Sequence, residues 1–183
     1  MRTTLSLLLL LASLVALDAQ RIAKTPRVTY DWQTGYVNIT ELAGGPGLSA
    51  TAFPYSKYYF GVTTVNGYQF TRNMKAGIGV GIHMHNDAAL FPAFIDARYS
   101  FSSQNWVPFI AAAGGLALNF NDLNNGTWMF LNPSIGIRYV AAKRTAVSFS
   151  TGLMSMTGEG TRHSFVSFKA GMEFKSKRTY NTR

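Results

Sequence analysis

Apolar and polar residues alternate along most of the chain beyond residue 34. The stretch 163–174 shows the pattern clearly, because one set of alternate positions is apolar and the other is polar, charged or glycine. The apolar set is Val166, Phe168, Ala170, Met172 and Phe174, and the other set is Ser167, Lys169, Gly171 and Glu173. Successive side chains of a β-strand point to opposite faces, so a period of two predicts a strand with one apolar face.

Similar segments follow one another along the chain, each rich in aromatic residues, β-branched residues and glycine, and each bounded by turn-forming or basic clusters. We predict eight strands, at 36–43, 57–71, 75–85, 90–101, 107–119, 127–139, 145–156 and 163–174. They are long for a soluble sheet, whose strands usually have about five or six residues. Their number is even, and glycine and serine crowd their polar faces, as a narrow interior requires.

The pattern therefore predicts an all-β fold, an eight-stranded antiparallel up-and-down transmembrane β-barrel. Aromatic residues near the segment ends would form the two interfacial girdles of such a barrel. They are Tyr58, Tyr59, Tyr68, Phe70, Trp106, Phe120, Trp128, Tyr139 and Phe174. A soluble β-barrel that binds an apolar ligand would show the same alternation with its apolar faces turned inward, so the direction of these faces separates the two folds.

The N-terminal residues have the features of a secretory signal. A basic start at Arg2 precedes an apolar run from Leu5 to Leu17, and small residues lead to Gln20. We expect residues 1–19 to be a signal peptide that is cleaved after Ala19. A signal anchor is the alternative, because Leu17 is large for its place before the cut. The rest divides into an N-terminal periplasmic segment at 20–34, the barrel at 35–174 and a basic C-terminal tail at 175–183.

Composition narrows the possible chemistry. Charged residues make up 14% of the chain, against about 25% in an ordinary soluble domain. Aromatic residues make up a further 14%, which excludes an intrinsically disordered chain. The chain has no cysteine, which excludes a disulfide framework, a thiolate zinc site and a cysteine nucleophile.

The sequence also resembles a known family. The order of Gly35-Tyr-Val-Asn-Ile-Thr-Glu-Leu42, Tyr59-Phe-Gly-Val-Thr-Thr-Val-Asn-Gly-Tyr-Gln-Phe70 and Gly77-Ile-Gly-Val-Gly81 is similar to that of small outer-membrane β-barrel proteins of the Bacteroidetes type. The implied architecture is that of the OmpA and OmpX barrels. The resemblance implies an outer-membrane location and recognition by the barrel-assembly machinery through an aromatic residue at the end of the last strand. That residue is Phe174 here, although nine residues follow it.

Several charged residues fall on the polar faces of the predicted strands. They are Asp96, Arg98, Arg138, Lys169 and Glu173, and we predict that they form an interior polar network with a structural role. Glu41 shares its parity with Val37 and Ile39, which leaves its direction open. The strand directions bring Arg138 and Glu173 to similar depth near the periplasmic end, so we expect these two residues to pair.

Two motifs suggest other chemistry. His83 and His85 share one face, but two imidazoles lack the further ligands of a metal site, and we expect solvated rim residues, with no metal and no cofactor. His163 precedes Ser164, as in some hydrolase sites, but neighbours on a strand face opposite ways and do not act together.

The positive charge is concentrated in particular segments. After removal of the signal, the 17 Lys and Arg lose Arg2 and the 8 Asp and Glu lose Asp18, which leaves 16 against 7. In the predicted topology, 11 of the 16 basic residues fall on the periplasmic side. They are Arg21, Lys24, Arg27, Arg72, Lys75, Lys143, Arg144, Lys175, Lys177, Arg178 and Arg183. We expect this basic rim to contact anionic lipid headgroups and expect no nucleic-acid partner; a solvated tail without a partner is the alternative.

Together these features predict an integral outer-membrane protein, surrounded by outer-membrane lipid, with a structural or interaction role and no catalytic activity. Nothing in the sequence identifies a protein partner. The alternative within the same architecture is a lipid-modifying enzyme, in which a serine, a histidine and an acidic residue converge.

Overall fold

The computed structural model describes residues 30–48, 57–85, 88–101, 105–119, 127–158 and 161–176. The predicted signal peptide and most of the predicted basic tail lie outside these residues. The strands are β1 (Gly35–Leu48), β2 (Tyr58–Gln69), β3 (Met74–His85), β4 (Ala88–Ser100), β5 (Trp106–Leu118), β6 (Thr127–Ala142), β7 (Thr145–Gly158) and β8 (Thr161–Lys175). In the part of the chain described, no helix is long and apolar enough to span a membrane.

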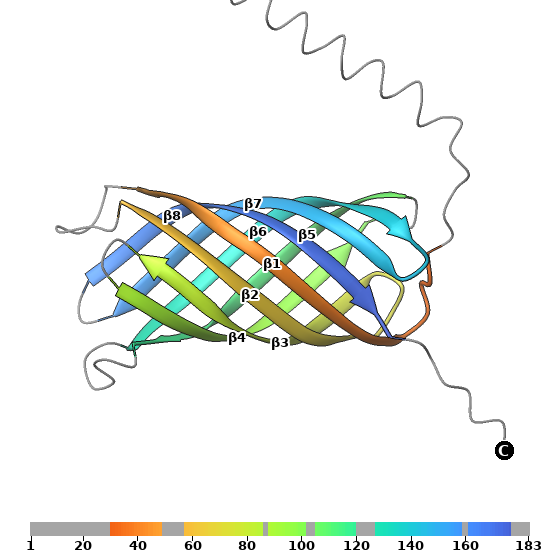
Figure 1. Ribbon diagram of the computed structural model, residues 1–183, viewed down its shortest axis with the longest axis horizontal. Helices are drawn as coiled ribbons and strands as arrows, with labels where there is room; N and C mark the ends of the chain where they lie inside the picture. The colour runs from red at the N-terminus through yellow and green to blue at the C-terminus, as the bar shows by residue number, and fades with distance from the viewer. Residues whose placement is uncertain are drawn as a thin grey trace, which may run out of the picture.

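Each strand pairs with its sequence neighbours in antiparallel fashion, and β1 also pairs with β8, so the sheet closes into a barrel (Figure 1). The predicted fold class, an eight-stranded up-and-down barrel, is confirmed. β1 starts and β8 ends at the same end of the barrel, which we call the terminal end. The opposite end, where β1 finishes and β8 begins, is the distal end.

The apolar faces of the strands point outward. Ile78 is 70% exposed and Met129 is 68% exposed, whereas the intervening positions on the same strands, such as Gly79 and Phe130, are buried. This inside-out distribution is the one that lipid stabilises, because hydrocarbon surrounds the apolar side chains and closure pairs every strand edge. The soluble alternative needed these faces to point inward, and it is wrong.

Exposed aromatic rings gather at the terminal end, where Tyr36, Tyr68, Phe70, Tyr99, Phe101, Trp106 and Phe174 lie near strand ends. Two of the residues predicted for the girdles lie elsewhere. Tyr59 is buried inside the barrel, and Trp128 packs against the interior apolar cluster. Both have inward parity, which the position of a residue near a strand end does not reveal.

The barrel interior has two layers of different character. An apolar and aromatic cluster fills the distal half, and its largest members are Tyr59, Phe94, Phe130, Met154 and Phe165. Charged side chains fill the middle and the terminal half. Glycine makes room for this packing: a Cβ atom on Gly79 would lie 2.2 Å from the ring of Phe94, and one on Gly171 would lie 2.7 Å from Cγ of Glu41.

Candidate functional site: the interior polar network

Glu173 is the centre of a charged cluster in the terminal half of the barrel. Its carboxylate accepts hydrogen bonds from Nη1 of Arg138, at 3.1 and 3.0 Å, and forms an ion pair with the Lys75 ammonium. These residues lie on β8, β6 and β3, so the contacts cross the lumen. All three are at least 95% buried. A buried charge is tolerated only when it is paired, and here one anion lies between two cations.

A second cluster lies near the middle of the barrel. Arg98 donates from both terminal nitrogens to the two carboxylate oxygens of Glu41, each at 2.9 Å, and its Nε donates to Asp96 at 2.7 Å. Glu41 lies on β1, while Arg98 and Asp96 are two residues apart on β4. The paired, planar geometry matches a guanidinium to a carboxylate, and it ties two strands that are not neighbours in the sheet.

The segment 30–34, which precedes β1, enters the mouth of the barrel at the terminal end. Tyr30 is 3% exposed, and its hydroxyl donates to Glu173. Burial, and then the negative charge of Glu173, raise the pKa of Tyr30, so the phenol keeps the proton that it donates. The guanidinium of Arg138 lies 5.3 Å from the ring centre of Tyr30 and 5.1 Å from that of Trp32. The two rings therefore cover the buried cation.

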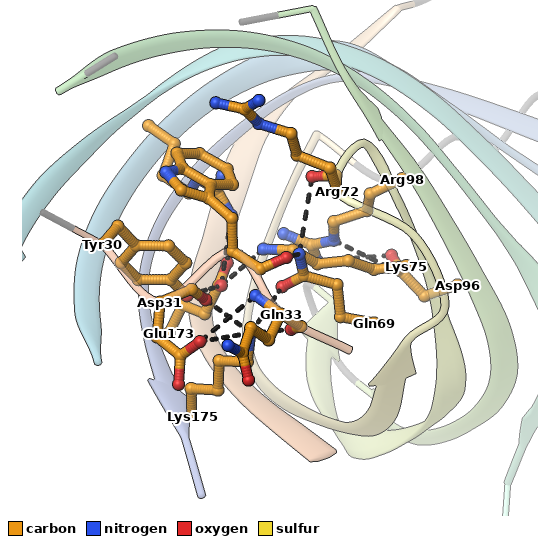
Figure 2. A network of polar contacts seen from close by, with 12 residues as sticks. Tyr30, Asp31, Gln33, Gln69, Arg72, Lys75, Asp96, Arg98, Glu173 and Lys175 are labelled. Atoms are coloured by element: carbon orange, nitrogen blue, oxygen red, sulfur yellow. Dashed lines mark hydrogen bonds and ion pairs between the residues drawn. The ribbon is translucent and has the colours of Figure 1, made fainter. Parts of the chain in front are cut away.

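Lys175 holds the backbone of the same segment. Its ammonium donates to the carbonyl oxygens of Asp31 and Gln33 and lies 3.9 Å from the Asp31 carboxylate. Gln69 donates to the carbonyl oxygen of Trp32 at 3.2 Å. Figure 2 shows these groups converging on the segment from the barrel wall. The end of the last strand and the end of β2 thus fix residues 30–34 across the opening.

The structure brings together most of the residues predicted for the interior network. Asp96 and Arg98 form one cluster, and Arg138 and Glu173 form the expected pair in the other. Lys169 is half-buried and lines a small cavity with Glu41 and Asp96, but it forms no ion pair within 4 Å among the described residues.

Other members of the network were missed or misplaced by sequence reasoning. Glu41, whose direction the parity left open, points inward. Lys75 and Lys175 were assigned to the basic rim, yet both are buried in the barrel, and β8 continues one residue beyond the predicted barrel end at 174. Inward parity with Gly77 and Glu173 was the signal available for these lysines. Tyr30 precedes the strands and has no periodic pattern to reveal it.

The histidines predicted at a solvated rim lie inside the barrel. His83 is 5% exposed and His85 is 9% exposed, and both rings pack on Tyr59. The prediction of solvated histidines failed because the apolar cluster of the distal half extends to the last residues of β3 and covers them. Within the described ranges, no group of three or more His, Cys, Asp or Glu residues is arranged to hold a metal ion.

The space left between these side chains is small. The interior cavity lined by Glu41, Tyr59, His83, Phe94, Asp96, Asn132 and Lys169 has a volume of about 20 Å³, room for roughly one water molecule. Asn132 Oδ1 is buried without a hydrogen-bond partner among the described residues. A water in this cavity would satisfy it.

Comparison with known proteins adds to the fold assignment. No family model matches the sequence, and no curated protein matches it. Among solved structures, the chain is similar to Neisserial surface protein A (NspA), with a TM-score of 0.63 and 15% identity over 79% of this chain and 99% of that one. It is also similar to the outer membrane protein OprG from Pseudomonas aeruginosa, with a TM-score of 0.50 and 9% identity over 82% and 100% of the chains. At these identities the likeness is one of fold.

The geometry of the Glu173 cluster generates a stability prediction. Replacing Glu173 with Gln leaves Lys75 and Arg138 buried without a counter-charge, and we expect the free energy of unfolding to fall by about 3 to 5 kcal/mol. Urea titration of the barrel in detergent micelles measures this change. Met172→Leu, at the adjacent lipid-facing position, is the control and should stay within about 0.5 kcal/mol.

Double-mutant cycles test the same contacts pairwise. Lys75→Met and Arg138→Met, each combined with Glu173→Gln, should show coupling energies of roughly 1 kcal/mol or more, because each removes one of the two cations that the carboxylate balances. Coupling energies of zero for both pairs would mean that lumen water solvates these charges.

Proposed function

We propose that this chain is an integral outer-membrane protein with a structural or interaction role, a closed lumen and no catalytic activity. The observation that carries the proposal is the inside-out distribution of side chains around a filled interior. An apolar outer surface needs lipid, and a filled lumen leaves no path for solutes. The similarity to proteins described as a Neisserial surface protein and an outer membrane protein supports the location. The finer resemblance, to barrels of the Bacteroidetes type and to OmpA and OmpX, belongs to the same proposal.

The proposed absence of catalysis is supported by the positions of Ser167, His83 and His85. The hydroxyl of Ser167 is completely buried and is hydrogen-bonded to Tyr59 and Asn132. His83 and His85 point into the same interior. A lipid substrate would lie against the outer wall, so these groups do not face it. Hydrolysed or re-acylated lipids that depend on the presence of the gene would favour the enzyme alternative instead.

Two further partners are part of the proposal. During biogenesis the barrel-assembly machinery would recognise the last strand, whose Phe174 faces outward near its end. At the terminal end, exposed Arg72 and Lys143 would contact anionic headgroups. The burial of Lys75 and Lys175 makes this rim less basic than the sequence suggested.

The location is tested by cell fractionation. We expect the tagged protein in the outer-membrane fraction of a density gradient, and we expect its gel mobility to change on boiling, because a closed barrel resists detergent until it is heated. Recovery in the soluble periplasmic fraction would contradict the proposal.

Closure of the lumen is tested in planar lipid bilayers. We expect the purified protein to produce no stable single-channel current, and the variant Trp32→Ala to produce none either, because the Arg98 cluster and the distal aromatic layer still block the path. Large and reproducible currents from the unaltered protein would show that the interior opens.

The basic rim is tested by lipid binding. Phosphatidylglycerol titrated into detergent-solubilised barrel should bind at the terminal end, and Lys143→Gln should weaken that binding about fivefold, equivalent to roughly 1 kcal/mol per headgroup contact. Lys57→Gln, an exposed lysine at the distal end, is the matched control. Equal effects of the two substitutions would mean that the attraction is non-specific.

A further inference from the structure

One part of the outer wall is polar. Asn38 and Thr40 on β1 and Thr64 and Asn66 on β2 point outward, and we call these four residues the Asn/Thr patch. They alternate with the buried residues Val37, Ile39, Glu41, Thr63 and Val65, so their direction follows from strand parity. The register places Asn38 opposite Asn66 and Thr40 opposite Thr64. Two polar cross-strand pairs therefore face the surrounding lipid.

The patch is surrounded by apolar side chains. Along β8, Phe174 is the register partner of Asn38 and Met172 is that of Thr40. Along β3, Ile78 is the partner of Asn66 and Val80 is that of Thr64. All four of these neighbours are exposed and apolar. Toward the distal end the next outward positions on β1 and β2 are Leu42 and Val62, and toward the terminal end they are Tyr36 and Tyr68. The patch therefore has apolar neighbours on three sides and tyrosines on the fourth.

Hydrogen bonds within the patch satisfy part of its polarity. Asn38 Nδ2 donates to Thr64 Oγ1 at 3.1 Å and to Asn66 Oδ1 at 2.9 Å. The Tyr36 hydroxyl also donates to Asn66 Oδ1, and the Thr40 hydroxyl lies 3.3 Å from both Asn38 Oδ1 and Thr64 Oγ1. Both amide hydrogens of Asn38 and both acceptor sites of Asn66 are thus in use.

The remaining groups are complementary to one another. Among the described residues, the amide nitrogen of Asn66 donates to no partner, which leaves its two hydrogens without an acceptor. Asn38 Oδ1 accepts a single bond, from Thr40, and keeps a free acceptor site. The unused donors of Asn66 and the unused acceptor of Asn38 belong to the same uncharged surface. Hydrocarbon cannot satisfy them, and an unpaired amide at bilayer depth is costly.

We propose that the Asn/Thr patch is the contact surface for a second copy of this chain, an inference that rests on the membrane location proposed above. The membrane orients both copies in the same way, so the pair is related by a two-fold axis parallel to the barrel axis, and the same patch meets itself. Asn66 of each copy then donates to Asn38 or Thr40 of the other. Leu42 and Val62 of both copies pack beside these hydrogen bonds.

Self-complementarity favours a second copy over a lipid molecule. The ester and acyl region of a phospholipid, which lies against a barrel wall, accepts hydrogen bonds but does not donate them, so it would leave the free acceptor of Asn38 unmatched. A charged partner finds no opposite charge, because the patch and its six apolar neighbours contain no ionisable group. A copy of the same surface supplies donors and acceptors together.

Cross-linking in lipid vesicles tests the proposal. The chain has no cysteine, so Val62→Cys places a single thiol beside the patch and leaves the patch intact. Ile110→Cys is the control, because it is a lipid-facing position on β5, across the barrel from β1. With a short bis-maleimide, we expect dimers from Val62→Cys at least several times more abundant than from Ile110→Cys.

A second variant ties the dimer to the patch. Adding Asn66→Leu to Val62→Cys should lower the cross-linked fraction about tenfold, because it removes two symmetry-related hydrogen bonds in the membrane. Leucine on a lipid-facing wall is compatible with the barrel, and the heat-dependent change in gel mobility verifies that each variant is folded.

The outcomes separate the two proposals. If the folded protein does not float with the vesicles, the membrane location fails. If it floats but Val62→Cys cross-links no better than Ile110→Cys, or if Asn66→Leu has no effect, the dimer proposal alone is wrong. A monomer that retains tightly bound phospholipid, released by Asn66→Leu, would show that the patch holds lipid instead.

Discussion

The structure depends on one constraint: a charge inside an eight-stranded barrel has little water around it and must find its counter-charge across the lumen. Glu173 meets this constraint for Lys75 and Arg138 at once, and it also accepts a hydrogen bond from the Tyr30 hydroxyl. Arg98 does the same for Glu41 and Asp96. The pairs that Glu173 forms with Lys75 and Arg138, and the pair of Arg98 with Glu41, join strands that are not neighbours, so they connect parts of the barrel that backbone hydrogen bonds between adjacent strands do not. Removing one member leaves the others buried without compensation.

The two halves of the barrel interior are filled by different kinds of side chain. In the distal half, aromatic rings and methionine side chains fill the lumen, and glycine on a neighbouring strand makes room for a ring, as Gly79 does for its register partner Phe94. In the terminal half, charge pairs and the segment 30–34 fill it. The apolar half tolerates small shifts in packing, whereas the charged half fixes specific atoms. The charged half therefore constrains the positions of its side chains more narrowly than the apolar half does.

Most of the fold could be predicted from the sequence, because a period of two is a strong signal when one face meets lipid and the other meets a narrow lumen. The prediction failed where the contrast between faces is weak. β1 carries Val37 and Ile39 inward and Asn38 and Thr40 outward, which reverses the usual pattern, so the parity of Glu41 gave no answer. β2 is reversed in the same way where Val65 points inward between Thr64 and Asn66. Lys75 and Lys175 lie at strand ends, where a sequence does not tell whether the chain has left the barrel. The position of Tyr30 follows from a contact with Glu173, far away in sequence, and no local pattern contains that information.

The position of residues 30–34 in the mouth of the barrel also bears on the order in which the barrel folds. Tyr30 and Glu173 are 143 positions apart in the sequence. Lys175, which donates hydrogen bonds to the same segment, is the last residue of β8. The site that binds residues 30–34 is therefore complete only when β8, which carries Glu173 and Lys175, has paired with β1. Contacts of such long sequence separation form late, since the loops between them must close first. We therefore expect residues 30–34 to cover the terminal opening only after β8 has paired with β1.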